Sequence, residues 1–266
     1  MSWGDALAQW EAYQRAAGAA ESTLQQRIYH VGRVAREVGG TPSRLTLDEL
    51  VTWLGSKDWS PNTRRSYRAS LRVFYTWAMA TGRVGDSPAH LLPSVRIPRP
   101  QPRPAPEIAY REALMRADDR GRLAIMLAAQ CGLRRTEIAQ ARTSDMEPDL
   151  LGMSLRVVGK GGHVRLVPLP DDLARLIATR PDGWLFPSSH GGHLTPHHLG
   201  KIVSRYLPGN LTTHTLRHRC ATVSYAATRD LRAVQELLGH AKPETTAIYT
   251  AVPDGAVRAA MSAAAA

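Results

Sequence analysis

The apolar positions near the start of the chain recur with the period of an α-helix. This pattern predicts helices over residues 3–15, 21–38, 46–54 and 61–80. The fourth helix has a clear start, because the Ser60 hydroxyl can accept a hydrogen bond from a backbone N–H of the first turn and Pro61 suits the first helical position. The first part of the chain is therefore expected to be an all-helical domain.

The pattern differs in the second part of the chain. Residues 153–169 read MSLRVVGKGGHVRLVPL, two segments of alternating polarity around a glycine-rich turn, which predicts a β-hairpin. The apolar run at 123–133 is too short to span a bilayer and indicates a buried helix. Helical patterns cover residues 105–117, 120–131, 136–141, 171–179, 196–206, 214–227, 231–238 and 243–249. The expected fold class is mainly α with a small β-sheet in the C-terminal domain, an α+β arrangement.

Proline separates the two parts. It occupies every second position from Pro98 to Pro106, and such a run favours an extended polyproline conformation. The sequence thus predicts a helical domain at 1–96, a linker at 97–106 and a second domain at 107–266. Arg99 and Arg103 keep the linker basic, as suits a strap along phosphates, although an ordinary surface linker explains the prolines equally well.

The chain has 34 Lys and Arg against 23 Asp and Glu, a formal net charge of +11, and both parts are basic. This balance favours a polyanionic partner, nucleic acid before an anionic membrane. A GC-rich genome that favours arginine codons is the other explanation. The two cysteines form no metal-type pair, and the N-terminus has no basic segment followed by an apolar one. A reducing cytoplasm and no membrane anchor are therefore expected.

Arginine marks one face of the helix expected at 61–80. At 3.6 residues per turn the apolar side chains of this helix fall on a separate arc, so it can pack inward on one side and enter a DNA major groove with the other. A solvated basic surface is the alternative. The candidate DNA contacts are Arg64, Arg65, Arg68 and Arg72, together with Arg99 and Arg103 of the linker.

Five short motifs in the second part carry groups that suit phosphate chemistry. Arg134, in GLRRTE, follows a glycine turn at a helix start, where free backbone N–H groups attract anions. Lys160 lies between glycines at the hairpin tip, where it can reach an oxygen of DNA. His214 and Arg217, in HTLRH, are three residues apart and share one helix face. Taken singly, each of these also has an ordinary explanation as a surface residue.

The last two motifs complete the series. His240 follows the end of a helix in LLGH, and Tyr249 lies nine residues later on the next expected helix. A lone tyrosine in such a position is by default a half-buried packing residue. Taken together, the order GLRxxE, GKG, HxLRH, LGH and Y resembles that of the tyrosine recombinases, which include phage integrases, Xer proteins and integron integrases. The resemblance covers the chain from about residue 106 to the end, and the helical first part looks like the core-binding domain of that family.

The resemblance implies that Tyr249 is the nucleophile, which attacks a backbone phosphorus to give a 3′-phosphotyrosyl enzyme and a free 5′-hydroxyl. The phosphate oxygens would be held by Arg134, Arg217 and His240. Lys160 would be the general acid for the leaving 5′-oxygen, and His214 would assist proton transfer at the tyrosine. This chemistry needs neither metal nor ATP. The sequence has no GxxxxGK[ST] loop and no obvious acidic metal cluster, so no cofactor is expected.

Two groups of residues invite a metal interpretation. Glu137 and Asp145 are expected to support Arg134 and the local structure rather than to bind a metal. Four histidines crowd into HGGHLTPHH, namely His190, His193, His197 and His198. Zinc is conceivable there. A loop that leads into a DNA-contacting helix is the simpler interpretation, and no metal site is predicted.

By the same resemblance, four copies of the chain would act on double-stranded DNA at core attachment sites, pass through a Holliday junction, and be monomers in solution. The first helix begins near Trp3, so a compact form without an arm-binding domain is expected. We favour a phage or mobile-element integrase in the cytoplasm of a bacterial host. The alternatives are an Xer-type dimer resolvase, a type IB topoisomerase and a DNA-binding protein without catalytic activity.

Overall fold

The structure is a computed structural model that describes residues 1–98, 102–239 and 261–263. The chain divides into two compact units, Met1–Arg99 and Pro100–Ala266. The division falls inside the proline-rich segment. Each unit has a hydrophobic core of its own.

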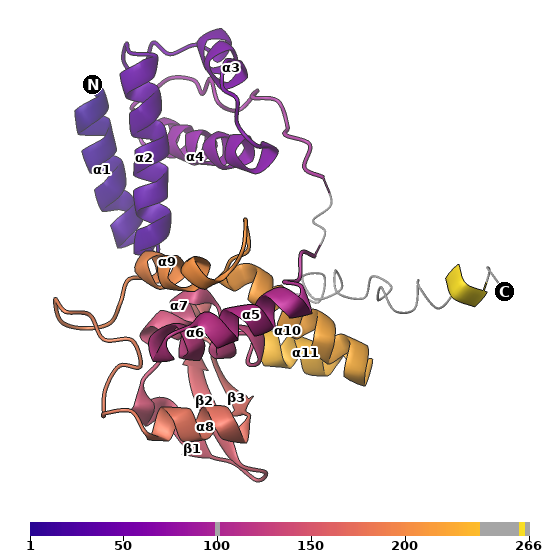
Figure 1. The fold of residues 1–266 in the computed structure, drawn as a ribbon. Helices are drawn as coiled ribbons and strands as arrows, with labels where there is room; N and C mark the ends of the chain where they lie inside the picture. Colours follow the sequence, from indigo (N-terminus) through magenta and orange to yellow (C-terminus); the bar gives the residue numbers. More distant parts are fainter. Residues whose placement is uncertain (99–101, 240–260, 264–266) are drawn as a thin grey trace. The chain divides into compact units, whose positions relative to one another are not determined.

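The first unit consists of helices (Figure 1). They are α1 (Trp3–Ala16), α2 (Glu21–Glu37), α3 (Leu47–Gly55) and α4 (Pro61–Ala80). The start of α4 is as predicted, because Pro61 is its first residue and the Ser60 hydroxyl accepts a hydrogen bond from the Thr63 backbone N–H at 3.2 Å. The prediction of helices alone in this region is confirmed for its described residues.

Aromatic side chains fill the core of the first unit. α2 packs against both α1 and α4. Trp10 of α1 is fully buried and meets Phe74 of α4 edge to face, with ring centroids 5.1 Å apart. Such a pair stabilises the core beyond the burial of its apolar surface. α4 thus turns its apolar face inward, as its pattern predicts, and its four predicted DNA-contacting arginines are exposed or half-buried.

The second unit mixes helices with one small sheet (Figure 1). Its elements in chain order are α5 (Glu107–Arg116), α6 (Asp119–Ala129), α7 (Arg135–Gln140), η1 (Thr143–Asp145), β1 (Met146–Pro148), β2 (Met153–Val158), η2 (Lys160–Gly162), β3 (Val164–Leu169), α8 (Asp171–Ala178), α9 (Pro196–Tyr206), α10 (Thr213–Thr228) and α11 (Leu231–Leu238). The mainly helical α+β class is therefore confirmed.

The sheet is antiparallel, with the strand order β1-β2-β3. The predicted hairpin is formed by β2 and β3, in which Met153 lies opposite Leu169 and Val158 opposite Val164. The sequence does not predict β1. This strand has only three residues, too few for a pattern of polarity to indicate a strand, and it ends at Pro148, which an edge strand tolerates.

α6 is the central helix of the second unit. It packs against α5, α8, α9 and α10, and its residues Leu123, Ile125 and Leu127 are fully buried. The close approach of α9 depends on Gly121, where a Cβ atom would lie 2.3 Å from Cε2 of Tyr206. The buried helix expected from the apolar run is thus present. Within the part of the chain that the structure describes, no helix has the length and apolar character needed to cross a membrane.

The end of the proline-rich segment is bound to α10. The Ala105 backbone N–H donates a hydrogen bond to the Thr215 carbonyl at 2.9 Å. Glu107, the first residue of α5, accepts two hydrogen bonds from the Arg219 guanidinium, at 2.9 and 2.6 Å. The start of the second unit is therefore fixed to α10 at two points.

Candidate active site

A buried carboxylate lies at the centre of the candidate site. Glu137, in the first turn of α7, is only 4% exposed. The Arg134 guanidinium donates to its Oε1 at 2.8 Å, and the Arg134 backbone N–H donates to its Oε2 at 2.8 Å. Arg165 of β3 donates to both oxygens, at 3.1 and 2.8 Å. Pairing of this kind is what a carboxylate needs in order to be buried.

The charge of Glu137 is stabilised by these donors. Burial by itself raises the pKa of this carboxyl, but the hydrogen bonds from Arg165 and Arg134 outweigh it and lower the pKa to about 2. The side chain is therefore ionised at neutral pH. The Nη1 atom of Arg217 lies 3.9 Å from its Oε2. Three guanidinium groups thus surround one carboxylate, which leaves the site with the net positive charge that suits a phosphate.

Backbone carbonyls hold Arg217 in place. This residue is 2% exposed on α10. Its guanidinium donates to the carbonyl of Gly132 and, at 2.7 Å, to the carbonyl of Leu238. The two carbonyls belong to the GLR and LLGH motifs, so three separate motifs meet at one side chain.

Both motif glycines have backbone conformations that favour glycine. The φ angle is 63° at Gly132 and 62° at Gly239. A Cβ atom at Gly132 would lie 2.6 Å from Cδ2 of Leu238, and one at Gly239 would lie 2.9 Å from Cδ of Arg165. The Gly239 carbonyl also accepts a hydrogen bond from Arg134 at 3.3 Å. These glycines therefore permit both the turns and the close packing that bring the arginines together.

Two histidines of α10 contact each other. The Nε2 atoms of His214 and His218 are 2.8 Å apart, and the rings meet edge to face at 84°. His214 is exposed as a residue, but its ring packs against His218. Desolvation of the ring lowers the pKa of His214, and the positive charges of Arg217 and Arg134 lower it further. His218 is buried, and burial, then His214 and Arg217, lower its pKa to about 4. Both shifts therefore favour the neutral form of the imidazole.

Several of these side chains open onto one cleft of about 670 Å³. Arg134, His214 and Arg217 line it, and α9 contributes His197 and Lys201. No carboxylate is among the described residues of the lining. A concave surface with cationic groups and hydrogen-bond donors suits an anionic ligand.

Residues 109–255 match the Phage integrase family. The chain belongs to this family. Its catalytic unit is a tyrosine recombinase domain.

Curated relatives of this recombinase cover most of its length. The tyrosine recombinase XerD of Pseudomonas putida is 32% identical over 234 residues, which make up 78% of this chain and 76% of the relative. The tyrosine recombinase XerA of Pyrococcus horikoshii is 28% identical over 270 residues, with 97% of this chain and 92% of the relative covered.

Solved structures share the fold of the recombinase. A lambda integrase(75-356) dimer bound to a COC′ core site has a TM-score of 0.75 at 18% identity, with 91% of this chain and 96% of that chain covered. The XerH site-specific recombinase bound to difH substrate, in a pre-cleavage complex, has a TM-score of 0.68 at 21% identity, with 94% and 81% covered.

The structure brings together three of the predicted catalytic residues of the recombinase. Arg134, His214 and Arg217 line the same cleft. Lys160 is in η2, the short turn between β2 and β3. His240 and Tyr249 lie outside the described residues, so their catalytic roles stay predictions.

Two residues of the site, Arg165 and His218, have no role assigned to them from the sequence. Arg165 follows the alternation of β3, opposite Val157 of β2, and nothing near it in the sequence marks it as a partner of Glu137. His218 does have a signal, because it is four residues after His214 on one helix and side chains at that spacing meet. The predicted supporting role of Glu137 agrees with its ion pair to Arg134.

Two of the predicted DNA-contacting arginines are bound within their own unit. Arg64 donates to the carbonyls of Lys57 and Trp59, at 2.6 and 3.2 Å. Arg68 donates to the carbonyl of Leu92 at 3.0 Å. Both side chains therefore hold loops against α4 as well as giving it positive charge.

The remaining predicted DNA contacts have different surroundings. Arg65 and Arg103 are exposed and Arg72 is half-buried. Arg99 lies outside the described residues. Within residues 1–98, 102–239 and 261–263, no three side chains of His, Cys, Asp or Glu are grouped so that they could hold a metal ion. The histidines of the 190–198 segment therefore do not form such a group.

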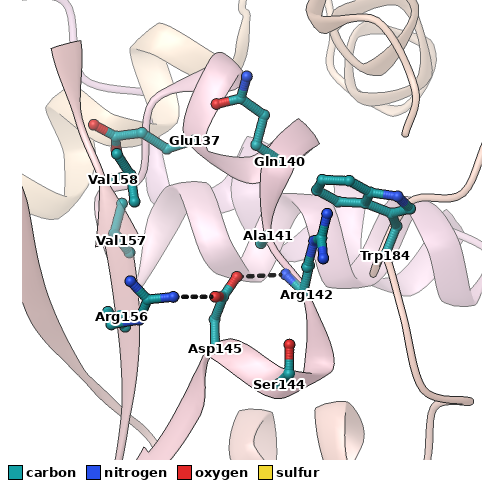
Figure 2. A pocket seen from close by; sticks show the side chains of 10 residues that line it. All are labelled: Glu137, Gln140, Ala141, Arg142, Ser144, Asp145, Arg156, Val157, Val158 and Trp184. Atoms are coloured by element: carbon teal, nitrogen blue, oxygen red, sulfur yellow. Dashed lines mark hydrogen bonds and ion pairs between the residues drawn. The ribbon is translucent and has the colours of Figure 1, made fainter. Parts of the chain in front are cut away.

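A separate pocket of about 270 Å³ lies beside α7, η1 and β2 (Figure 2). Asp145 accepts hydrogen bonds there from the Arg142 backbone N–H at 2.9 Å and from the Arg156 guanidinium at 3.2 Å. The Arg142 guanidinium lies 3.7 Å from the centre of the Trp184 ring. Asp145 thus fixes the turn that connects α7 to the sheet, in agreement with its predicted structural role.

Proposed function

We propose that this recombinase cuts and rejoins DNA at specific sites with Tyr249 as its nucleophile. The observation that supports this most is that Arg134 lies at the same cleft as His214 and Arg217, although its motif is far from theirs in the sequence. A buried carboxylate and backbone carbonyls fix the two guanidinium groups. Fixed donors of this kind stabilise the charge that develops on a phosphate in its transition state.

The proposed reaction conserves the phosphodiester bond energy. The Tyr249 oxygen bonds to the phosphorus, the bond from phosphorus to the 5′-oxygen breaks, and a 3′-phosphotyrosine and a 5′-hydroxyl result. His214 takes the phenolic proton, and Lys160 gives a proton to the leaving 5′-oxygen. The reverse sequence with a second 5′-hydroxyl rejoins the DNA.

The non-bridging oxygens are held by protein groups alone in this proposal. Arg134 and Arg217 pair with them, and His240 donates a further hydrogen bond. Since guanidinium groups supply the positive charge that a Mg²⁺ ion provides in other phosphoryl transfers, the reaction needs no metal. It needs no ATP, because the covalent intermediate stores the energy for rejoining.

The two basic units form the DNA clamp in this proposal. Residues 1–96 are the core-binding domain, 97–106 the linker and 107–266 the catalytic domain. Proteins with the same fold are known as a dimer on a core site and as a tetramer on a Holliday junction. We infer the same assembly here, with monomers that form a tetramer on double-stranded DNA in the bacterial cytoplasm.

The biological role has two candidates. An integrase of a phage or mobile element joins two separate DNA molecules, whereas a dimer resolvase separates two sites on one molecule. The family assignment supports the first, and the curated Xer relatives at about 30% identity support the second. Recombination assays with the sites on one plasmid or on two would separate them.

Covalent trapping tests the proposed chemistry. Pure protein is mixed with a supercoiled plasmid that carries its own gene and flanking DNA, with EDTA present and ATP absent, and the reaction is quenched with detergent. We expect protein-linked nicks at one mapped sequence from the wild type and none from Tyr249→Phe. Scattered nicks would indicate a topoisomerase. The absence of adducts on DNA that the protein binds specifically would contradict the proposal and indicate a binding protein.

A further inference from the structure

The contact between His214 and His218 restricts where their protons lie. An N-to-N distance of 2.8 Å is a hydrogen bond, and such a bond needs one N–H and one lone pair. Two imidazolium rings cannot face each other in this way, because each would offer only an N–H. If both rings are neutral, one carries its proton on Nε2 and the other carries it on Nδ1.

Charges from several elements favour the neutral pair. Arg217 lies on the same helix as the pair, and Arg134 is the residue immediately before α7; the positive charges of both lower the pKa of His214. Lys201 of α9 lines the same cleft as His214. His214 is also the second residue of α10, where the positive end of the helix dipole disfavours a cation. Among the described groups around the pair, the nearby charges named here therefore all favour the neutral form of the imidazoles.

The burial of His218 makes its hydrogen bond structurally important. This ring is 8% exposed, whereas His214 is exposed and lines the cleft. A buried polar group costs stability unless it is paired. The pair therefore has a fixed inner ring and an outer ring that can meet a substrate, in the same way that a carboxylate orients the histidine of a hydrolase triad.

We propose that His218 is a positioning residue that accepts a hydrogen bond from Nε2–H of His214 and so leaves the Nδ1 lone pair of His214 to take the proton of the nucleophilic phenol. The inference rests on the proposed function, in which His214 acts at the tyrosine. When Nδ1 takes that proton, His214 becomes an imidazolium and keeps its Nε2–H. The hydrogen bond to Nε2 of His218, which stays neutral with its own proton on Nδ1, stabilises this charge.

Two substitutions at position 218 separate the acceptor from the bulk of the ring. His218→Phe keeps a ring of similar size and removes the acceptor, and His218→Gln places an amide oxygen near the position of Nε2. The measurement is single-turnover formation of the covalent adduct on a DNA fragment that contains the mapped site, with protein in excess, from about pH 5 to pH 9. His90→Phe, at an exposed histidine of the first unit, is the matched control.

We expect His218→Phe to slow adduct formation by about 10- to 100-fold, as loss of an orienting partner does at other sites. We expect His218→Gln to recover most of the rate and His90→Phe to match the wild type. Since the acceptor stabilises the protonated form of His214, its loss should also move the acidic limb of the pH profile to lower pH. A role in folding alone would change the amount of active protein and leave this limb where it is.

A double-mutant cycle gives the second test. If His218 acts through His214, His218→Phe should have little further effect on the rate in a His214→Ala background. Independent, multiplying effects would overturn the inference, and so would a wild-type rate and pH profile in His218→Phe. A wild type that forms no adduct at all would instead contradict the proposed function.

Discussion

The guanidinium of Arg165 donates two hydrogen bonds to the carboxylate of Glu137, at 3.1 and 2.8 Å, from a strand 28 positions further along the chain. Because Glu137 also holds Arg134, this bond connects the sheet to the cleft. Arg165 is 13% exposed at its side chain, and its Nε donates to the Leu237 carbonyl at 3.2 Å. One arginine outside the recognised motifs thus joins α7, β3 and the end of α11.

Removal of the shared carboxylate should destabilise the catalytic unit. Glu137→Gln keeps the side-chain shape but leaves Arg165 and Arg134 without their anion, and loss of one partner of a buried ion pair costs about 3–5 kcal/mol. The measurement is urea denaturation of the full chain, followed by a probe in the second unit. Glu112→Gln, at an exposed position of α5, should change the free energy of unfolding by less than about 0.5 kcal/mol. Equal effects of the two substitutions would contradict this account.

The same carboxylate should make stability depend on pH. The pKa of Glu137 is lowered from 4.5 to about 2 on folding. A lowered pKa means that the stabilisation is complete above the unfolded value and is lost as the pH falls from about 4.5 toward 2. The shift in pKa corresponds to about 3 kcal/mol of stability. The difference in unfolding free energy between wild type and Glu137→Gln should therefore shrink as the pH falls across this range. A difference that stays constant down to pH 2 would show that the charge is not what stabilises the site.

Gly132 should tolerate alanine less well than another glycine of the same conformation. Its φ angle is 63°, and a Cβ atom would lie 2.6 Å from Leu238 Cδ2, whereas Gly209 has a φ angle of 57° and no atom within 4 Å of its Cβ position. Gly209→Ala should lower the free energy of unfolding only by the cost of a left-handed backbone conformation in alanine, about 1–2 kcal/mol. Gly132→Ala should cost more and should also reduce adduct formation, because the Gly132 carbonyl accepts a hydrogen bond from Arg217. Similar melting temperatures for both variants would rule out the packing argument.

The arginines of α4 should divide into two classes. Arg65→Ala removes an exposed charge, so it should weaken DNA binding. The slope of the logarithm of the binding constant against the logarithm of salt concentration should fall by about 1, the amount expected for one lost phosphate contact. Arg68→Ala also removes the hydrogen bond to the Leu92 carbonyl and should cost about 1 kcal/mol of stability. Fluorescence anisotropy over a salt series and thermal unfolding measure the two effects. An Arg65→Ala variant that binds DNA like the wild type would remove this residue from the proposed interface.

Local signals explain what the sequence predicts well. Ser60 and Pro61 define the start of α4, and the alternation around Lys160 defines the hairpin, because both patterns act over a few residues. The approach of Arg134 to Arg217 follows only from the family resemblance, since no short-range rule joins motifs so distant.

The rest could not be predicted, because it depends on packing between distant segments. The role of Arg165 requires the register of β3 against β2 and the position of α7 beside the sheet. The hydrogen bonds of Arg64 to loop carbonyls likewise depend on how the chain before α4 folds back. Strand β1, with three residues, is too short to leave a pattern.

The hydrogen bond from Ala105 to Thr215 joins the end of the proline-rich run to α10. Ala105 belongs to the proline-rich run by its sequence, but its backbone is bound to α10. Because Thr215 lies between His214 and Arg217, the end of the proline-rich run is joined directly to the helical turn that carries both side chains.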